Sequence, residues 1–269
     1  MRRFTPDPVS FRAHHLHLFF RPTDLVISSG SGFVYQRHES LYLITNWHNV
    51  AGRNPETGQC LSETLAIPDI VSLPVRLREN PGNWQREQIR LYSDNAMQNP
   101  AWLVHPTLRQ KVDVVALPLR ALERDQYRFF PINAVEFDDQ FPTVVGDDAF
   151  VVGYPFHESP DGQWPIWKRA SIATEPQVDV DGLPKLLIDT ATRPGLSGSP
   201  VLMQRSGLHG VVGLKLAPDT LIGTIRNFIG IYSGRVGADE VRAQLGIVWK
   251  KLVIDEIIDG ATLGRANEA

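Results

Sequence analysis

The chain has little cysteine, little net charge and no long apolar run, and each shortage excludes a class of protein. Cys60 is the only cysteine among 269 residues, so no disulfide can form within the chain and stability must come from a packed core. No stretch approaches the roughly 18 consecutive apolar residues of a membrane-spanning helix. The net charge of −3, from 27 basic and 30 acidic residues, gives no sign of a nucleic-acid or acidic-membrane partner.

The composition predicts one globular unit. Hydrophobic residues make up 42% of the chain and charged residues 21%, which is enough apolar material for a core and an ordinary amount of charge. A length of 269 residues suits one compact unit with two lobes. Residues 11–20 are interrupted by Arg12 and three histidines, so they do not form the apolar part of a signal peptide. We therefore expect a protein of the cytoplasm.

A serine flanked by glycines is the most informative feature of the sequence. Residues 194–200, Pro-Gly-Leu-Ser-Gly-Ser-Pro, follow the apolar strand predicted over residues 186–190. Gly195 and Gly198 allow a sharp turn with positive φ, which would leave the amides of Gly195 and Ser197 free to point into one small concavity. A serine attacks a carbonyl only when a base takes its proton and donors receive the developing charge. Without such partners, the pattern indicates a tight turn between two strands.

Two partners for Ser197 occur earlier in the chain. An apolar strand within residues 41–50 runs into His48, and Asp113 stands at the head of the apolar run 111–119. An acid that leads into such a run is costly to bury unless it has a hydrogen-bonding partner. An imidazole that must hold one tautomer supplies that partner. The order His, Asp, Ser along the chain is one of three known arrangements of this catalytic geometry.

With these residues in place, the chain resembles the chymotrypsin/trypsin-like serine peptidases, in their bacterial form without disulfides. Each matching motif is weak alone, but six occur in the family's order from about residue 28 to residue 258. A bacterial cytoplasm is the simplest location for such a protein. The motifs are residues 30–34, 45–48, 113–117, 151–155, 195–200 and 228–234.

Two residues depart from the pattern of the vertebrate digestive members of this family. Ser199 stands where those enzymes have a second glycine after the nucleophile, and Trp47 stands where they have a small residue before the histidine. Asn46 resembles the residue that bacterial relatives have at this position. Neither departure argues against activity, although the bulk of Trp47 beside His48 could affect access to the site.

The resemblance implies an all-β fold of two six-stranded antiparallel β-barrels with a short C-terminal helix. One peptidase unit then spans residues 1–258. Its N-terminal barrel covers about residues 10–122 and its C-terminal barrel about residues 135–250. A closing helix follows at about residues 251–259, and residues 260–269 form a loose tail.

Local patterns add finer expectations. The proline within residues 71–77 predicts an edge strand, and the turn-rich residues 79–100 predict an insertion on the first barrel. Between residues 203 and 227, an apolar run at 210–216 predicts a strand and the rest predicts a loop over the site. Residues 238–245 read as a short helix.

The resemblance assigns a role to each member of the constellation. His48 would take the proton of Ser197 and pass it to the leaving amine, while Asp113 orients His48. The amides of Gly195 and Ser197 would form the oxyanion hole. Ser233, Gly234 and Arg235 would lie along the substrate and pair with an extended peptide as an added β-strand.

The resemblance also places a specificity pocket, with Ala191 near its base. Thr192 and Arg193 would form the wall before the nucleophile, and Gly246 would lie across from them. No acid stands at the base, so a preference for arginine or lysine is not expected. Asp189 shares the strand face of Ala191 and keeps a basic preference open. We expect a small or medium apolar residue on the acyl side of the cleaved bond.

The sequence leaves more than one function open. The first is a serine endopeptidase that acts on peptides or proteins without a metal or other cofactor. The second is a catalytically silent or gated peptide-binding sensor on the same fold. For a cytoplasmic endopeptidase we expect gated activity, either through an unformed oxyanion hole at Leu196 or through the loop within residues 203–227, and we allow for a regulatory partner. The third is an esterase-like hydrolase, which a closed pocket in place of a peptide groove would favour.

His14, His15 and His17 could bind a metal. Because no carboxylate or cysteine accompanies them at ligand spacing, we interpret them as surface or groove residues.

Overall fold

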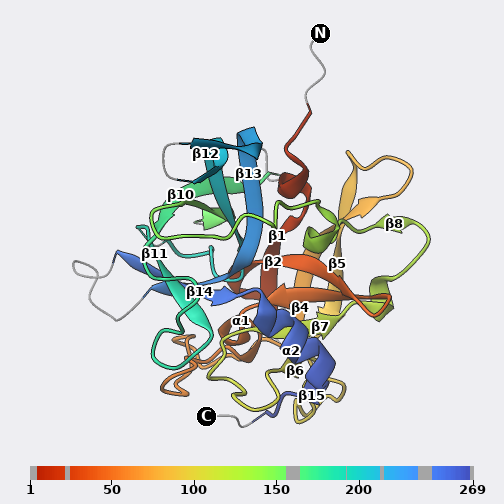
Figure 1. The fold of residues 1–269 in the computed structure, drawn as a ribbon. Helices are drawn as coiled ribbons and strands as arrows, with labels where there is room; N and C mark the ends of the chain where they lie inside the picture. The colour runs from red at the N-terminus through yellow and green to blue at the C-terminus, as the bar shows by residue number, and fades with distance from the viewer. Residues whose placement is uncertain are drawn as a thin grey trace.

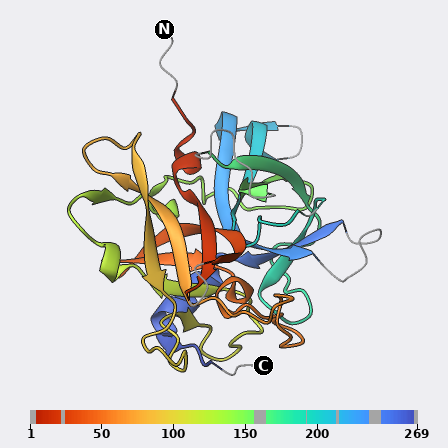
Figure 2. The same cartoon turned by 180° about the vertical axis from the view of Figure 1, so that it is seen from behind.

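The structure, a computed structural model, consists of two β-lobes that lie side by side (Figure 1). Seen from behind, the strands of the first half of the chain form one lobe, and those of the second half, apart from β15, form the other (Figure 2). The structure describes residues 5–21, 25–155, 164–191, 193–212, 215–235 and 244–266, without the side chains of residues 211–212, 215–219 and 235.

The first lobe is a sheet of nine antiparallel strands. Its main path runs in the order β15-β6-β7-β3-β2-β1-β4-β5, and β8 pairs with β4. The strands are β1 (Ala13–Phe20), β2 (Leu25–Arg37), β3 (Ser40–Thr45), β4 (Ile70–Leu77), β5 (Trp84–Arg90), β6 (Leu103–Val104), β7 (Val115–Pro118), β8 (Tyr127–Arg128) and β15 (Thr262–Leu263), with the short helices η1 (Pro8–Phe11), α1 (Trp47–Ala51), η2 (Arg120–Leu122) and η3 (Ile132–Ala134).

The second lobe is a closed barrel of six antiparallel strands in the order β10-β11-β14-β13-β12-β9. The prediction of an all-β fold of two antiparallel lobes is confirmed. The first lobe differs in detail, because its described strands number nine and their pairings form an open path. The second-lobe strands are β9 (Asp148–Gly153), β10 (Ile166–Ile172), β11 (Lys185–Asp189), β12 (Pro200–Val212), β13 (Lys215–Arg235) and β14 (Leu245–Lys250), followed by helix α2 (Leu252–Gly260).

One apolar core joins the two lobes. Phe33 of β2 and Phe228 of β13 meet edge to face with ring centroids 5.5 Å apart, a favoured geometry for aromatic pairs. Ile254 and Ile257 of α2 are buried in the same cluster. The lobes are therefore held together by packing in a chain with a single cysteine. Among the described residues, no helix is long and apolar enough to cross a membrane.

The predicted loop within residues 203–227 is wrong. β12 and β13 continue as a long hairpin, with Pro200 opposite Ile231 at one end and Val212 opposite Lys215 at the other. The hairpin extends from the barrel at the top of Figure 1. The β-branched residues of 220–225 favour extended pairing, and they outweigh the proline and aspartate that suggested a loop.

Two smaller predictions are also wrong, and a third falls mostly outside the described residues. Strand β4 is not an edge, because it pairs with β1 and with β5, and β5 arises inside the predicted insertion. The predicted loose tail instead adds β15 beside β6. The predicted helix 238–245 falls mostly outside the described residues, and Leu245 begins β14.

His14 and His15 of β1 are buried, and His17 is half-buried. Of the expected surface or groove positions, the surface alternative is therefore wrong for His14 and His15. His15 stacks on Tyr154 with ring centroids 5.1 Å apart and meets His17 edge to face. His14 is 6% exposed, and burial lowers its pKa to about 4, helped by the nearby charges of Arg76 and Arg86.

We predict that His14 makes the protein less stable in mild acid. Because the unfolded chain binds this proton near pH 6.5 and the folded chain only near pH 4, the free energy of unfolding falls as pH drops through that interval, by about 3 kcal/mol in full. Urea unfolding at pH 7.5 and pH 4.5 should therefore show a smaller acid loss for His14→Phe than for the native chain. An equal loss in both proteins would contradict this assignment.

Candidate active site

The chain brings His48 and Asp113 into direct contact. His48 lies on α1, which follows β3 directly, and Asp113 precedes β7, the strand that pairs with β3. The His48 Nδ1 atom lies 2.6 Å from Asp113 Oδ2, and the His48 backbone N–H donates to Oδ1 at 2.9 Å. Asn46 fixes the same segment, since its Nδ2 donates to the Asp113 carbonyl at 2.7 Å.

Ser233 contacts the same carboxylate. Its hydroxyl donates to Asp113 Oδ2, so Asp113 accepts hydrogen bonds from its neighbours at both oxygens. The sequence placed Ser233 only along the substrate, and the orientation of its side chain was missed. The carboxylate, which is buried, thereby meets the demand for partners that burial imposes.

Ser197 lies in a turn that depends on two glycines. Gly195 has φ +90° and Gly198 has φ +88°, values that L-residues with a side chain rarely adopt. A Cβ on Gly198 would lie 2.0 Å from the Ser31 carbonyl oxygen and 2.5 Å from Thr45 Oγ1. The second glycine is therefore required for space as well as for conformation.

The first lobe holds this turn through Ser31. The Ser31 backbone N–H donates to the Ser197 carbonyl at 2.8 Å, and the Ser31 hydroxyl donates to the Gly195 carbonyl at 2.8 Å. Asn49 Nδ2 donates to the Ser197 carbonyl at 3.2 Å and to Thr45 Oγ1 at 3.0 Å. Sequence reasoning missed Ser31, Thr45 and Asn49, although the first two lie in motifs that carried the family resemblance.

The amides of Gly195 and Ser197 remain open. Within the described part of the chain neither N–H donates a hydrogen bond, whereas the neighbouring amide of Gly198 donates to Tyr232 O at 2.8 Å. Leu196, between them, is completely buried in the second-lobe core. The turn is thus anchored by an apolar side chain and by the two carbonyls that Ser31 holds.

His48 and Ser197 line one cavity of about 200 Å³. The start of β2 and the segment that follows α1 contribute most of its other walls. The lining mixes apolar side chains with serine hydroxyls, which suits part of an extended peptide beside the nucleophile. The residues concerned are Ile27, Ser28, Ser29, Asn49, Gly52, Leu61, Ser62, Ala66 and Pro68, and sequence reasoning had singled out none of them.

The structure describes only some of the predicted specificity residues. Ala191 and Arg193 are exposed, and Thr192 and the side chain of Arg235 lie outside what the structure describes. Gly234 has φ +104° with no atom near its missing Cβ.

Gly246 closely faces two other side chains. A Cβ there would lie 2.6 Å from Tyr232 and 3.0 Å from Thr190. The buried Thr190, one residue before Ala191, is therefore the side chain that packs opposite Gly246.

Two β-lobes with a serine, a histidine and an aspartate gathered at their junction define the class of serine peptidases with a trypsin-like fold. The sequence profile of the trypsin-like peptidase domain matches residues 30–214. The chain belongs to this family. It is a serine endopeptidase whose substrates are peptides or proteins.

Several solved structures are similar to this chain at low sequence identity. The serine endoprotease from Yersinia pestis is 12% identical with a TM-score of 0.50, over 95% of this chain and 67% of that chain. The Rv3671c protease from M. tuberculosis in its active form is 17% identical with a TM-score of 0.48, over 97% of this chain and 89% of that chain. The HtrA-type protease AlgW with tripeptide is 16% identical with a TM-score of 0.48, over 94% of this chain and 61% of that chain. No curated protein matches the sequence.

Proposed function

We propose that the enzyme cleaves peptide bonds through Ser197, with His48 as the base and Asp113 as its orienting partner. The observation that carries the proposal is the 2.6 Å contact between His48 Nδ1 and Asp113 Oδ2, on a histidine that shares a cavity with Ser197. The contact directs Nδ1–H toward the carboxylate and leaves Nε2 as the basic nitrogen.

The reaction then follows from these positions. Ser197 Oγ attacks the carbonyl carbon of the scissile bond while His48 Nε2 takes the hydroxyl proton. His48 gives this proton to the leaving amine as the C–N bond breaks, and an ester between Ser197 and the acyl half of the substrate remains. A water molecule, deprotonated by His48, then cleaves the ester. Asp113 stays ionised throughout and stabilises the charged imidazole.

The amides of Gly195 and Ser197 would receive the negative charge on the carbonyl oxygen. Support comes from these two N–H groups, which donate to no group of the described residues, and from the hydrogen bonds of Ser31 to the Gly195 and Ser197 carbonyls. Donors that are fixed before the reaction stabilise the oxyanion without further reorganisation. The gate expected at Leu196 stays a prediction, and the segment expected to gate the site as a loop within residues 203–227 is a hairpin.

Digestion of a mixed peptide library, read by mass spectrometry, tests the proposed function. The native enzyme should produce internal cleavages, and Ser197→Ala, which keeps the turn but lacks the nucleophile, should produce none that mass spectrometry detects. Cleavage by Ser197→Ala at the native rate would refute the assignment of Ser197. A library left intact by both proteins would favour the silent peptide-binding module instead.

The same digestion predicts a cleavage preference. Because Tyr232 and Thr190 fill the space in front of Gly246, we expect cleavage after small or medium apolar residues such as alanine or valine, at least about tenfold faster than after arginine; one methylene in such a pocket already changes binding by about 10- to 200-fold. Cleavage mainly after arginine or lysine would contradict this expectation and assign a binding role to Asp189, which is exposed at the end of β11.

A further inference from the structure

Asn49 connects the segment of the proposed base with the segment of the proposed nucleophile. It follows His48 on α1 of the first lobe and is 7% exposed. Its amide nitrogen Nδ2 donates to Thr45 Oγ1 at 3.0 Å and to the carbonyl of Ser197, in the second lobe, at 3.2 Å. One side chain therefore joins the helix that carries His48 to the turn that carries Ser197.

The two acceptors determine which end of the Asn49 amide faces them. A carbonyl oxygen such as that of Ser197 can only accept a hydrogen bond. The Thr45 hydroxyl gives its own proton to the Ser31 carbonyl at 2.8 Å, so it also accepts from Asn49. The NH₂ group has two hydrogens and satisfies both acceptors, whereas the amide oxygen would face two oxygens without a proton between them.

These contacts belong to a closed network across the junction of the lobes. The Ser31 backbone N–H donates to the same Ser197 carbonyl at 2.8 Å, and the Ser31 carbonyl accepts from Thr45. The path that leaves the Ser197 carbonyl through Asn49 therefore returns to it through Ser31. Hydrogen bonds that share partners in a buried network strengthen one another, so two coupled donors hold the Ser197 carbonyl.

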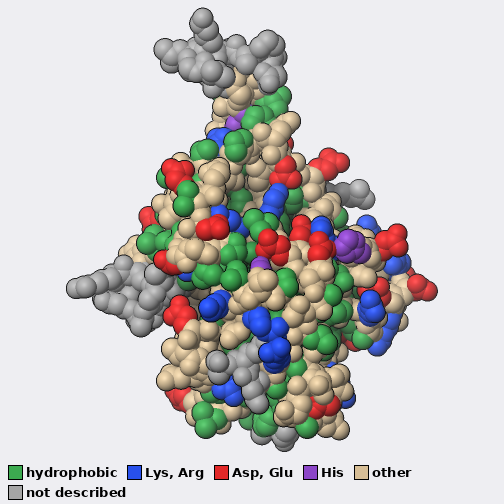
Figure 3. Space-filling model, turned by 60° about the horizontal axis from the view of Figure 1, so that its bottom comes forward, with side chains coloured by type: hydrophobic (Ala, Val, Ile, Leu, Met, Phe, Trp, Pro, Cys, Tyr) green, Lys and Arg blue, Asp and Glu red, His purple; other side chains and the backbone are tan. Residues whose placement is uncertain are grey.

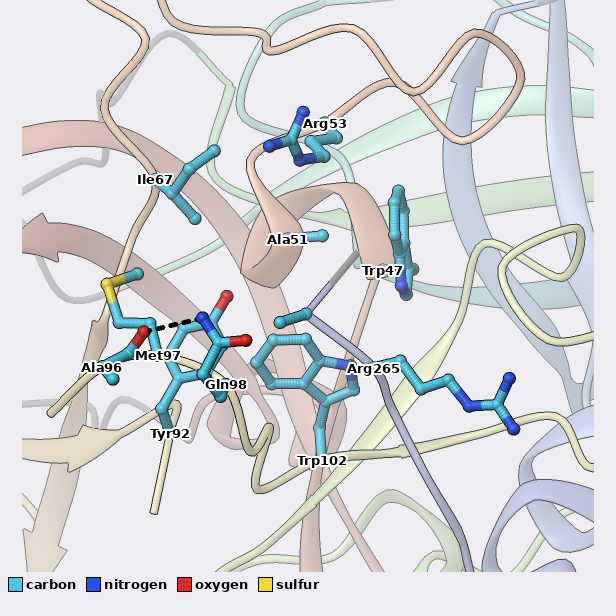
Figure 4. A pocket seen from close by; sticks show the side chains of 11 residues that line it. Trp47, Ala51, Arg53, Ile67, Tyr92, Ala96, Met97, Gln98, Trp102 and Arg265 are labelled. Atoms are coloured by element: carbon cyan, nitrogen blue, oxygen red, sulfur yellow. Dashed lines mark hydrogen bonds between the residues drawn. The ribbon is translucent and has the colours of Figure 1, made fainter. Parts of the chain in front are cut away.

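The surroundings of Asn49 leave its amide little room to move. A Cβ on Gly30 would lie 2.7 Å from Nδ2 and 3.1 Å from Oδ1 of Asn49, so the amide packs directly against the backbone of β2. The helix is anchored on another face, where the buried side chains of Trp47 and Ala51 line a separate pocket (Figure 4). Asn49 is therefore a fixed link between α1 and the turn of Ser197.

We propose that Asn49 is a positioning residue, which holds Ser197 at the separation from His48 that proton transfer requires. The inference rests on the proposed function, because it concerns the same base and the same nucleophile. Asn49 gives up no proton in the reaction and acts through the backbone of Ser197. Reacting groups on two lobes need such a link, because a misplacement of about 1 Å costs about a hundredfold in rate.

Asn49→Leu tests the proposal, because leucine has a similar size and branching but no donor. Ser197 keeps the N–H of Ser31 and Thr45 keeps the Ser31 carbonyl, so the variant should fold. With the best library peptide, kcat should fall about ten- to a hundredfold while KM stays within about twofold. Labelling by a fluorophosphonate probe should slow by a similar factor. Native rates in both assays, or a loss confined to KM, would overturn the proposal.

Asn227→Leu is the matched control. Asn227 is also buried, at 6% exposed, and its Nδ2 donates to a backbone carbonyl, that of Phe141, at 2.7 Å. Its replacement should lower the melting temperature and leave kcat within about twofold of the native value. A loss of kcat equal to that in Asn49→Leu would show that the effect follows from the loss of any buried asparagine, and would overturn the positioning role.

Thr45→Val tests the same network from its other end, and replaces Asn49→Leu if that variant does not fold. It removes the acceptor of Asn49 and the donor to Ser31, so kcat should fall about tenfold at unchanged KM. The double variant should lose no more activity than Asn49→Leu alone, because both changes break one network. A native kcat in Thr45→Val, or additive losses in the double variant, would overturn the proposal.

The native protein separates this inference from the proposed function. If the native protein neither cleaves peptides nor reacts with the probe, the proposed function fails and the role of Asn49 fails with it. If it reacts and Asn49→Leu reacts equally fast, Ser197 stands as the nucleophile and only the role of Asn49 is refuted.

Discussion

Asp113→Asn should lower kcat/KM for peptide cleavage by about ten-thousand-fold while the protein remains folded. The carboxylate accepts the His48 backbone N–H at 2.9 Å and faces Nδ1 at 2.6 Å. An asparagine of nearly the same shape would present an N–H₂ group to this nitrogen or to the Ser233 hydroxyl, and would favour the imidazole tautomer that leaves no base toward Ser197. Steady-state hydrolysis of the best library peptide measures the loss, and thermal unfolding verifies the fold.

Ser233→Ala is the matched control for this prediction. It removes one hydrogen bond to the carboxylate and keeps the charge, so the expected loss is about ten- to a hundred-fold, as for one hydrogen bond to a charged group. Equal losses in the two variants would mean that Asp113 acts only as a structural residue. A loss below tenfold in Asp113→Asn would remove it from the proposed mechanism.

Gly198→Ala should reduce the free energy of unfolding by at least about 4 kcal/mol. Its φ of +88° disfavours any side chain, and its Cβ would overlap the Ser31 carbonyl oxygen at 2.0 Å. Because this oxygen belongs to the backbone of the first lobe, neither partner can move without separating the lobes at the nucleophile. Urea unfolding of the two proteins measures the difference.

Gly146→Ala supplies the control, because Gly146 has φ +87° and no atom within 4 Å of its missing Cβ. It carries the same conformational strain without the overlap, and should cost only about 1–2 kcal/mol. Comparable losses in the two variants would show that the contact between Gly198 and Ser31 contributes nothing. That result would contradict the role assigned to Ser31 in holding the turn.

The sequence predicted the fold class because short motifs at strand ends carry strong local signals. It failed in the hairpin of β12 and β13, where one proline suggested a loop although the flanking β-branched residues pair across strands. It also failed for β15, whose partner β6 lies far away in the chain. Pairing between distant segments is decided by packing, which no local pattern reports.

The candidate site, like the fold, could be predicted only in part from the sequence. His48, Asp113 and Ser197 could be chosen because each stands in a recognisable local setting, and the structure gathers all three at the junction of the lobes. The residues that position them could not be chosen in this way. Ser31 reaches Gly195 from the other lobe, and Ser233 reaches Asp113 through a side chain for which the sequence suggested only a backbone role.

The charge of the chain gave little information about its function. The face shown in Figure 3 carries both acidic and basic side chains, and the net charge of −3 does not fix how they are arranged.

We propose that Ser197 is an activated nucleophile in the chain as it stands. Labelling with a fluorophosphonate probe, read by intact mass, tests this most directly, because the probe needs the serine, its base and the oxyanion donors together but no particular peptide. One adduct on the native protein and none on Ser197→Ala is the predicted result. An unlabelled native protein, or an adduct that persists in Ser197→Ala, would contradict the account.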